Sequence, residues 1–396
     1  MKIFLFLISV VSLLLPLRGQ GGHAALSDVN RCIGFPLLPS DGKWERSALE
    51  KKLQQSGLVF QGSLIRRSVF LHDKKIFNIP AVELLVISNE DGIVTQIDVI
   101  YSNKGDTVKK SKYITGNIRR DSRQLRNTLT KLFGPPDKKR SGIKGLRSNT
   151  QNWEFGKIRF SLEFSNKEYT ILHIFNRDKT ILSSSEGKFK VHGDVLTGNV
   201  KGNAFGDVFI ENIPMVNQGD KGYCVPATVE RVLRYMGISN INMHQLADSA
   251  DTGRGGGTYF SSIVGSLNSF CRNFGLKAHK CGELEMGSLK KYISRGMPVM
   301  WCMYVNGSLS EAAAYSKKYR AEAKSPKEWL KSIRRQKVKS GGGSHMCLIV
   351  GYNEETMEIA VSNSWGDKEL TPAWIKLKSA LRVSQGMSLV LMPKTD

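Results

Sequence analysis

The chain has 396 residues, of which 40% are hydrophobic and 23% charged, with 38 glycines and 12 prolines. This composition is ordinary for a globular protein, so it excludes wholesale disorder, a collagen-like chain and a small disulfide-dense scaffold. Because domains usually hold about 100–200 residues, two domains are the natural expectation. The 58 lysines and arginines outnumber the 35 acidic residues and give a net charge of +23. Such a charge leaves anionic polymers, anionic lipid surfaces and nucleic acid open as partners and says nothing about the fold.

An apolar run at residues 3–17 follows Lys2 and is succeeded by small and polar residues up to Ala25. The run is too short to cross a bilayer comfortably, and its flanks are typical of a secretory signal peptide. We therefore expect residues 1–25 to be a signal peptide and the protein to be secreted or periplasmic; an uncleaved membrane anchor is the alternative. No second long apolar run follows, so we expect no transmembrane segment in the mature chain.

Residues 28–200 contain two helical patterns, at 45–56 and 123–133, each followed by runs with β-strand character. These runs lie at 58–62, 82–88, 94–101, 152–155, 158–164 and 169–175. Residues 89–92 form a good hairpin turn between two of the runs. A helix followed by antiparallel strands thus occurs twice, which suggests an internal duplication. We expect a separate α+β N-terminal domain of unknown role, in positioning, regulation or binding, because it contains no catalytic constellation.

The pattern of apolar and polar residues changes after a polar, glycine-rich boundary at 178–206. Helices are expected at 225–235, 259–274 and 287–295, and strands at 298–305, 345–352, 357–363 and 373–378. Helices that precede antiparallel strands predict a second α+β domain over residues 207–396. Asp207 and Glu211 are interpreted as structural.

A strongly basic segment, residues 310–339, interrupts this pattern and is predicted to be helical. Its basic residues include Lys317, Lys318, Arg320, Lys331, Arg334, Arg335, Lys337 and Lys339. The ordinary interpretation is a solvated helix, and a docking surface for an anionic cell-envelope polymer or an acidic substrate is the alternative. Aromatic residues for stacking nucleobases are sparse there, so a nucleic-acid partner is not expected.

Six cysteines are few for a secreted chain of this length, and no CxxC pair supports a zinc ribbon. If one cysteine is a working thiol, five remain and cannot all pair. Cys271 and Cys281 could form a bridge, although the sequence does not fix this pairing. Cys302 and Cys347 lie inside apolar runs and are interpreted as small buried hydrophobic residues.

Cys224 stands at the start of the predicted helix 225–235, with Pro226 in its first turn. Unpaired N–H groups and the helix dipole favour negative charge at this end, so they bias a thiol toward the nucleophilic thiolate. A cysteine at a helix start is more often structural, so this observation needs support from other segments.

The support comes from two later segments. Gly341–Ser344 deliver His345 at the start of an apolar strand, and Asn363 ends the next strand before Ser364-Trp365-Gly366. A hairpin between the two strands would bring Asn363 back beside His345. The Asn363 oxygen would then accept a hydrogen bond from one imidazole nitrogen while the other nitrogen faces the thiol. Trp365 would cover that bond from water.

These segments resemble the papain-like cysteine peptidases over roughly residues 210–396. The shared pattern is a glutamine six residues before a helix-start cysteine, a later histidine that opens a strand, and Asn-Ser-Trp-Gly. By this resemblance Cys224 is the nucleophile, His345 the general acid/base and Asn363 its orienting residue. Gln218 would donate to the oxyanion hole together with the Cys224 backbone N–H. The resemblance implies a papain-like fold with a helical half and an antiparallel sheet.

The chain also departs from the pattern typical of papain and the cathepsins. Their Cys-Gly-Ser-Cys-Trp surroundings are absent, the interval from cysteine to histidine is short, and no helical propeptide is evident. Cys224-Val225-Pro226-Ala227 and residues 289–299 look more like the bacterial branch that includes the double-glycine leader peptidases. Those enzymes are usually joined to a membrane transporter, which this chain lacks, so export of a leader-bearing peptide is not expected.

The sequence therefore predicts a secreted cysteine peptidase that acts on peptide or protein substrates without a metal or cofactor. The glycine loop 251–258 is interpreted as a flexible wall of the substrate groove, so Gly255, Gly256, Gly257 and Trp365 are the expected substrate-binding residues. An amidase or transamidase that acts on cell-envelope peptides would use the same catalytic residues. A non-catalytic binding relative would keep only the groove and the basic surface.

Overall fold

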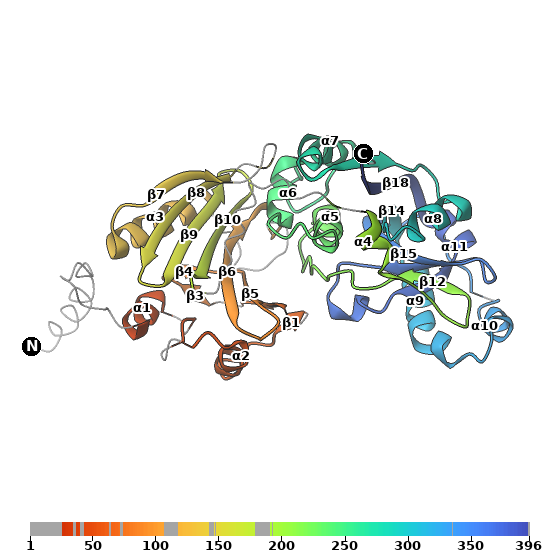
Figure 1. Ribbon diagram of the computed structural model, residues 1–396, viewed down its shortest axis with the longest axis horizontal. Helices are drawn as coiled ribbons and strands as arrows, with labels where there is room; N and C mark the ends of the chain where they lie inside the picture. The colour runs from red at the N-terminus through yellow and green to blue at the C-terminus, as the bar shows by residue number, and fades with distance from the viewer. Residues whose placement is uncertain are drawn as a thin grey trace, which may run out of the picture.

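The computed structural model describes residues 26–34, 37–39, 43–62, 65–71, 74–106, 118–141, 146, 148–178, 191, 193–334 and 336–394. Within these residues the fold mixes helices with two eight-stranded antiparallel sheets (Figure 1). The predicted signal peptide, residues 1–25, lies outside the described residues. No helix in the described part of the chain is long and apolar enough to cross a membrane.

The N-terminal sheet has the strand order β1-β2-β5-β6-β10-β9-β8-β7. Its strands are β1 (Gln61–Gly62), β2 (Arg66–Phe70), β5 (Glu83–Ser88), β6 (Val94–Asn103), β7 (Asp137–Ser141), β8 (Ser148–Phe155), β9 (Ile158–Ser165) and β10 (Tyr169–Asn176). A small hairpin, β3 (Lys75–Ile76) and β4 (Ile79–Pro80), stands apart. This strand order is symmetrical about the β6–β10 pair, which is the order that two repeats of a helix followed by strands would produce. The internal duplication remains a prediction.

The two faces of this sheet differ in polarity because residues alternate along each strand. Side chains such as Leu84, Val99 and Leu172 form an apolar core, to which the helices α1 (Leu26–Ile33), α2 (Arg46–Gln54) and α3 (Ile118–Phe133) contribute. The opposite face carries buried charged groups. There the His173 imidazole lies 2.6 Å from an Asp98 oxygen and 3.2 Å from a Glu163 oxygen. Burial lowers the pKa of His173, but the two carboxylates outweigh this effect and raise it to about 10.

The C-terminal sheet has the order β11-β12-β15-β14-β18-β13, and β16 and β17 extend it from β15. Its strands are β11 (Val200–Gly202), β12 (Asp207–Ile210), β13 (Leu276–Lys280), β14 (Val299–Val305), β15 (Gly343–Asn353), β16 (Glu358–Ser362), β17 (Ala373–Lys376) and β18 (Ser384–Pro393). The helices around it are α4 (Gly193–Thr197), α5 (Cys224–Tyr235), α6 (Met243–Ser249), α7 (Phe260–Phe270), α8 (Met286–Ile293), α9 (Gly307–Tyr319), α10 (Pro326–Ser332) and α11 (Leu377–Val383). A continuous apolar core joins sheet and helices.

Helix α5 and helix α6 face the polar side of the N-terminal sheet (Figure 1). Arg66 on β2 pairs with the buried Glu230 of α5 at 3.2 Å, and Gln245 of α6 donates to Glu163 at 2.9 Å. Ser165 also donates to Asp248 at 2.9 Å. The two sheets are therefore connected through charged and polar groups that are largely withdrawn from water.

Several sequence predictions about elements were wrong. The expected strand 58–62 is limited to β1, and the last expected strand gives way to α11 after Lys376. The expected helix 259–274 is confirmed as α7 followed by a 3-10 helix from Cys271 to Phe274. The chain closes with β18, which was not predicted because its apolar core is short and follows a helix directly. Cys271 and Cys281 are both free thiols, so they form no bridge; Cys302 and Cys347 are buried, as expected.

The basic insertion contains two short helices, α9 and α10, in place of one long helix. Asn306 caps the start of α9 and Ser325 caps the start of α10, which ends at Ser332. Arg320 was expected on a solvated basic helix, but it is buried and pairs with Asp207 at 2.6 Å and Glu358 at 3.2 Å. It is thus an anchor for the insertion, and Asp207 is structural as expected. Binding of an anionic polymer by the exposed basic residues remains a prediction.

Candidate active site

Cys224 is the first residue of α5, and its sulfur lies against β15. The backbone of Met346, the neighbour of His345, hydrogen-bonds the sulfur, and Thr228 one turn later donates to the Met346 carbonyl at 3.1 Å. These contacts place the thiol beside the residue next to His345. Burial raises the pKa of Cys224, and backbone hydrogen bonds from Met346, Val225 and Cys224 itself only partly offset this effect. The helix start therefore does not yield a resting thiolate, contrary to the expectation from sequence.

His345 and Asn363 form the expected hydrogen bond. Nε2 of His345 lies 3.0 Å from Oδ1 of Asn363. The other end of the Asn363 amide donates from Nδ2 to Glu369 at 3.2 Å, which fixes the amide so that its oxygen faces the imidazole. An amide oxygen only accepts, so the proton sits on Nε2 and Nδ1 is left as the basic nitrogen. Burial lowers the pKa of His345 to about 4, although the Asn363 bond and the Glu369 charge oppose this.

Glu369 and Arg231 were not singled out from the sequence. Glu369 is buried after Asn363 in a short 3-10 turn and also pairs with Lys317 of α9 at 3.0 Å. Arg231, two turns along α5 from Cys224, donates to the carbonyl oxygen of Asn363 at 2.8 Å. The sequence signal that could have pointed to Glu369 is an acidic residue soon after Asn-Ser-Trp-Gly. For Arg231 it is the helical spacing from Cys224.

The Trp365 ring packs against the His345 ring in a tilted arrangement, with ring centroids 4.7 Å apart and an angle of 31° between planes. It also borders an open pocket of about 430 Å³ whose other lining residues are Asn217, Gln218, Gly219, Asp220 and Lys221. Trp365 thus covers the imidazole, as expected, and stands at the wall of this pocket.

Gln218 lies at this pocket with its carboxamide fixed at both ends. Ser364 donates to its oxygen at 2.8 Å, and its Nε2 donates to the Lys221 carbonyl at 3.0 Å. The amide nitrogen carries two N–H groups, so one is left to donate elsewhere. The sequence prediction of Gln218 as an oxyanion donor is compatible with this geometry.

The glycine loop packs against the backbone that precedes Cys224. Gly257 donates to the Gly222 carbonyl at 3.1 Å, and a Cβ on Gly256 would lie 2.1 Å from the Gly222 Cα. Gly255 donates to Lys104 of the N-terminal region at 3.0 Å. Neither described pocket that contains Trp365 includes Gly255, Gly256 or Gly257. Their role in substrate binding remains a prediction.

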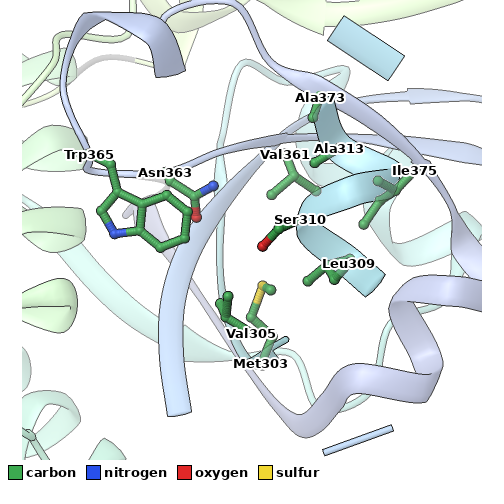
Figure 2. A pocket seen from close by; sticks show the side chains of 10 residues that line it. All are labelled: Met303, Val305, Leu309, Ser310, Ala313, Val361, Asn363, Trp365, Ala373 and Ile375. Atoms are coloured by element: carbon green, nitrogen blue, oxygen red, sulfur yellow. The ribbon is translucent and has the colours of Figure 1, made fainter. Parts of the chain in front are cut away.

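A second, apolar pocket of about 40 Å³ is bordered by Asn363 and Trp365 (Figure 2). Leu309, Ser310 and Ala313 of α9 form one wall, opposite strand residues such as Val361. The basic insertion therefore closes over the strand that carries Asn363. Among the described residues, no group of three histidine, cysteine, aspartate or glutamate side chains is arranged to hold a metal ion.

Residues 210–380 match the model of the Peptidase_C39 like family. This segment is therefore similar to the C39-like peptidases. The match agrees with the papain-like resemblance seen in the sequence of the C-terminal half. No curated protein matches the chain.

Two solved structures resemble the chain at low identity. A C39-like peptidase from Bacillus anthracis is 14% identical, with a TM-score of 0.31, and the match covers 48% of this chain and 99% of that one. Xylellain, a cysteine protease from Xylella fastidiosa, is 11% identical, with a TM-score of 0.32, and the match covers 52% of this chain and 92% of that one.

Proposed function

We propose that the protein is a secreted cysteine peptidase that hydrolyses peptide bonds through an acyl-thioester intermediate. The observation that carries this proposal is the oriented His345–Asn363 pair in a segment that matches the Peptidase_C39 like family, with the Cys224 sulfur hydrogen-bonded by the backbone of Met346, the residue after His345. The apolar run at residues 3–17 supports secretion. Residues 28–200 would then form a separate unit ahead of the peptidase domain.

In the proposed reaction, Cys224 Sγ bonds to the carbonyl carbon of the scissile peptide while its proton passes to Nδ1 of His345. The carbonyl oxygen becomes anionic and accepts hydrogen bonds from Gln218 Nε2 and the Cys224 N–H. His345 returns the proton to the leaving amine as the C–N bond breaks, which leaves an acyl-thioester. Water then attacks the thioester, gives a proton to His345 and releases the acid, and the proton returns to sulfur.

The resting thiol and imidazole are both uncharged at neutral pH. This follows because burial raises the pKa of Cys224 and lowers that of His345 to about 4. A thiolate–imidazolium pair would need the opposite order of pKa values. His345 therefore acts as a general base during attack.

Gln218→Ala tests the oxyanion site. Loss of one such donor typically lowers turnover by about 10²–10³-fold, so we expect a crippled enzyme that remains detectable. A diverse peptide pool is incubated with the wild type and the variant, and mass spectrometry identifies the products. Gln54→Ala, on the surface helix α2, is the control and should cleave like the wild type. Equal turnover by Gln218→Ala would remove this residue from the mechanism.

The same product analysis separates hydrolysis from acyl transfer. Hydrolysis adds one water at each cleaved bond, with or without an added amine. Products in which the amine replaces water would contradict the peptidase proposal and support a transamidase.

Glu369 is proposed to position Asn363 and to raise the pKa of His345 by its charge. Glu369→Gln keeps an acceptor for Asn363 and loses the charge, so the pKa of His345 should fall further below about 4. The acid limb of the kcat/KM profile should then move to lower pH. Glu369→Ala loses the acceptor as well, and we expect kcat to fall about 10–100-fold, as for other lost orienting partners.

The matched control is Glu354→Gln, which removes a carboxylate from an exposed pair with Lys290. It should leave both the pH profile and kcat unchanged. If Glu369→Ala behaves like this control, Glu369 has no positioning role.

A further inference from the structure

The backbone just before the thiol is held from outside the peptidase domain. We call residues 218–224 the nucleophile loop, because they connect Gln218 to Cys224. The Lys221 side chain is fully buried, and its Nζ lies 2.9 Å from the Glu83 carboxylate on β5. The same ammonium lies 5.0 Å above the Phe70 ring on β2. The N-terminal sheet thus receives a charged side chain of the nucleophile loop.

A second side chain of the loop contacts the turns at the ends of β6 and β9. Tyr223, which is fully buried, donates from its hydroxyl to the Glu168 carboxylate and accepts from the Gly105 N–H at 3.0 Å. Glu168 lies in the turn between β9 and β10 and has Lys104 at 3.7 Å. Two positions of the loop, on either side of Gly222, are therefore fixed by two acidic residues, one on β5 and one in the turn between β9 and β10.

These contacts reach the proposed oxyanion donors through covalent neighbours. The carbonyl of Lys221 accepts the hydrogen bond from Gln218 Nε2, so the residue that Glu83 holds also holds the Gln218 carboxamide. Tyr223 directly precedes Cys224, whose N–H is the other donor. A displacement of the loop by even about 1 Å would misplace both donors, because such sites depend on fixed geometry.

We propose that the N-terminal sheet is a permanent part of the catalytic apparatus, in which Glu83 and Glu168 position the nucleophile loop. Residues 28–200 are then not a segment that is removed on activation. This inference rests on the proposed peptidase function.

The charge pairing across the contact supports permanence. Removal of the N-terminal sheet would take Glu83 from the Lys221 ammonium and Arg66 from Glu230, which would keep Arg234 at 2.7 Å. The contacts that hold the nucleophile loop would be lost with the sheet. The pocket bordered by Gln218 and Trp365 is open while the sheet is in place, so the sheet does not have to leave for a substrate to enter.

Glu83→Gln and Tyr223→Phe test the inference in the full-length protein. We expect each to lower kcat for a cleaved peptide by at least about tenfold, while KM changes by less than about twofold. Amide hydrogen exchange in residues 218–224 should become faster in both variants. Tyr223→Phe removes only one hydroxyl, so it gives a folded test protein if loss of the Glu83 charge prevents folding.

The matched control is Ser165→Ala, which removes a hydrogen bond to Asp248 in the same contact and leaves Glu83, Glu168 and Tyr223 unchanged. It should retain wild-type kcat and wild-type exchange in residues 218–224. Wild-type kcat in folded Glu83→Gln and Tyr223→Phe would overturn the inference, as would a gain in kcat on proteolytic removal of residues before 200. If the wild type cleaves no peptide, the proposed function fails. The positioning of the loop is then tested by hydrogen exchange alone: unchanged amide exchange in residues 218–224 of both variants would overturn it.

Discussion

Peptide cleavage is expected to disappear when Cys224 is replaced by alanine. The mechanism has no other nucleophile, because the sulfur must form the acyl-thioester. Loss of the nucleophile in a comparable hydrolase lowers kcat by about 10⁶-fold, which places the variant below ordinary detection. The measurement is product formation from a peptide pool by mass spectrometry, with unfolding curves to show that the variant is folded.

Cys281→Ala is the control for this experiment. Cys281 is also a partly exposed free thiol of the C-terminal half, but it follows β13 and bonds to the His279 carbonyl. Its loss should leave cleavage unchanged. Turnover by Cys224→Ala above one hundredth of the wild-type rate would contradict covalent catalysis by this residue. Binding of peptides without turnover by either protein would instead favour a non-catalytic relative.

The loss should be total even though the resting thiol is not ionised. Helix α5 offers N–H groups to the sulfur, but the surrounding burial raises the pKa more than they lower it. The sequence shows the helix start and not the depth at which it is buried, so it predicted only the first of these two effects. Activation then depends on Nδ1 of His345, which the Asn363 bond leaves unprotonated.

The local parts of the fold could be predicted because they depend on short-range patterns. Helix α5 and the two strands β15 and β16 follow from apolar periodicity and the turn between them. This hairpin brings His345 near Asn363, so their hydrogen bond was within reach of sequence reasoning. The family match over residues 210–380 agrees with the resemblance read from the same segments.

The connection between the two sheets could not be predicted. The pairs Lys221–Glu83 and Tyr223–Glu168 join residues more than fifty positions apart, and neither residue of a pair has an unusual local setting. Arg320 shows the same limit, because its local sequence is that of a solvated basic helix while its partners lie on β12 and β16. Buried charges are recognised only when both partners are in place.

Replacement of Arg231 by methionine is expected to destabilise the C-terminal half by at least about 1–3 kcal/mol, the typical cost of leaving a buried hydrogen-bonding group unsatisfied. Arg231 is buried, and burial lowers its pKa to about 10. Its guanidinium donates to the carbonyls of Pro214 and Asn363 at 3.0 and 2.8 Å. It also donates to the Ser362 hydroxyl at 2.8 Å. Methionine fills the volume but leaves these oxygens without donors.

Urea unfolding gives the change in the free energy of unfolding. The control variant Arg295→Met, at an exposed position in the turn after α8, should change it by less than about 0.5 kcal/mol. Arg231→Lys should recover only part of the loss, because one ammonium cannot reproduce a planar fork with several donors. Arg231 joins the helix of Cys224 to the strand end of Asn363, so the methionine variant should also lose kcat at temperatures where it remains folded. If Arg231→Met has the same free energy of unfolding as the wild type, solvent or neighbouring groups satisfy these oxygens. The hydrogen bonds of Arg231 between α5 and Asn363 would then not contribute to stability.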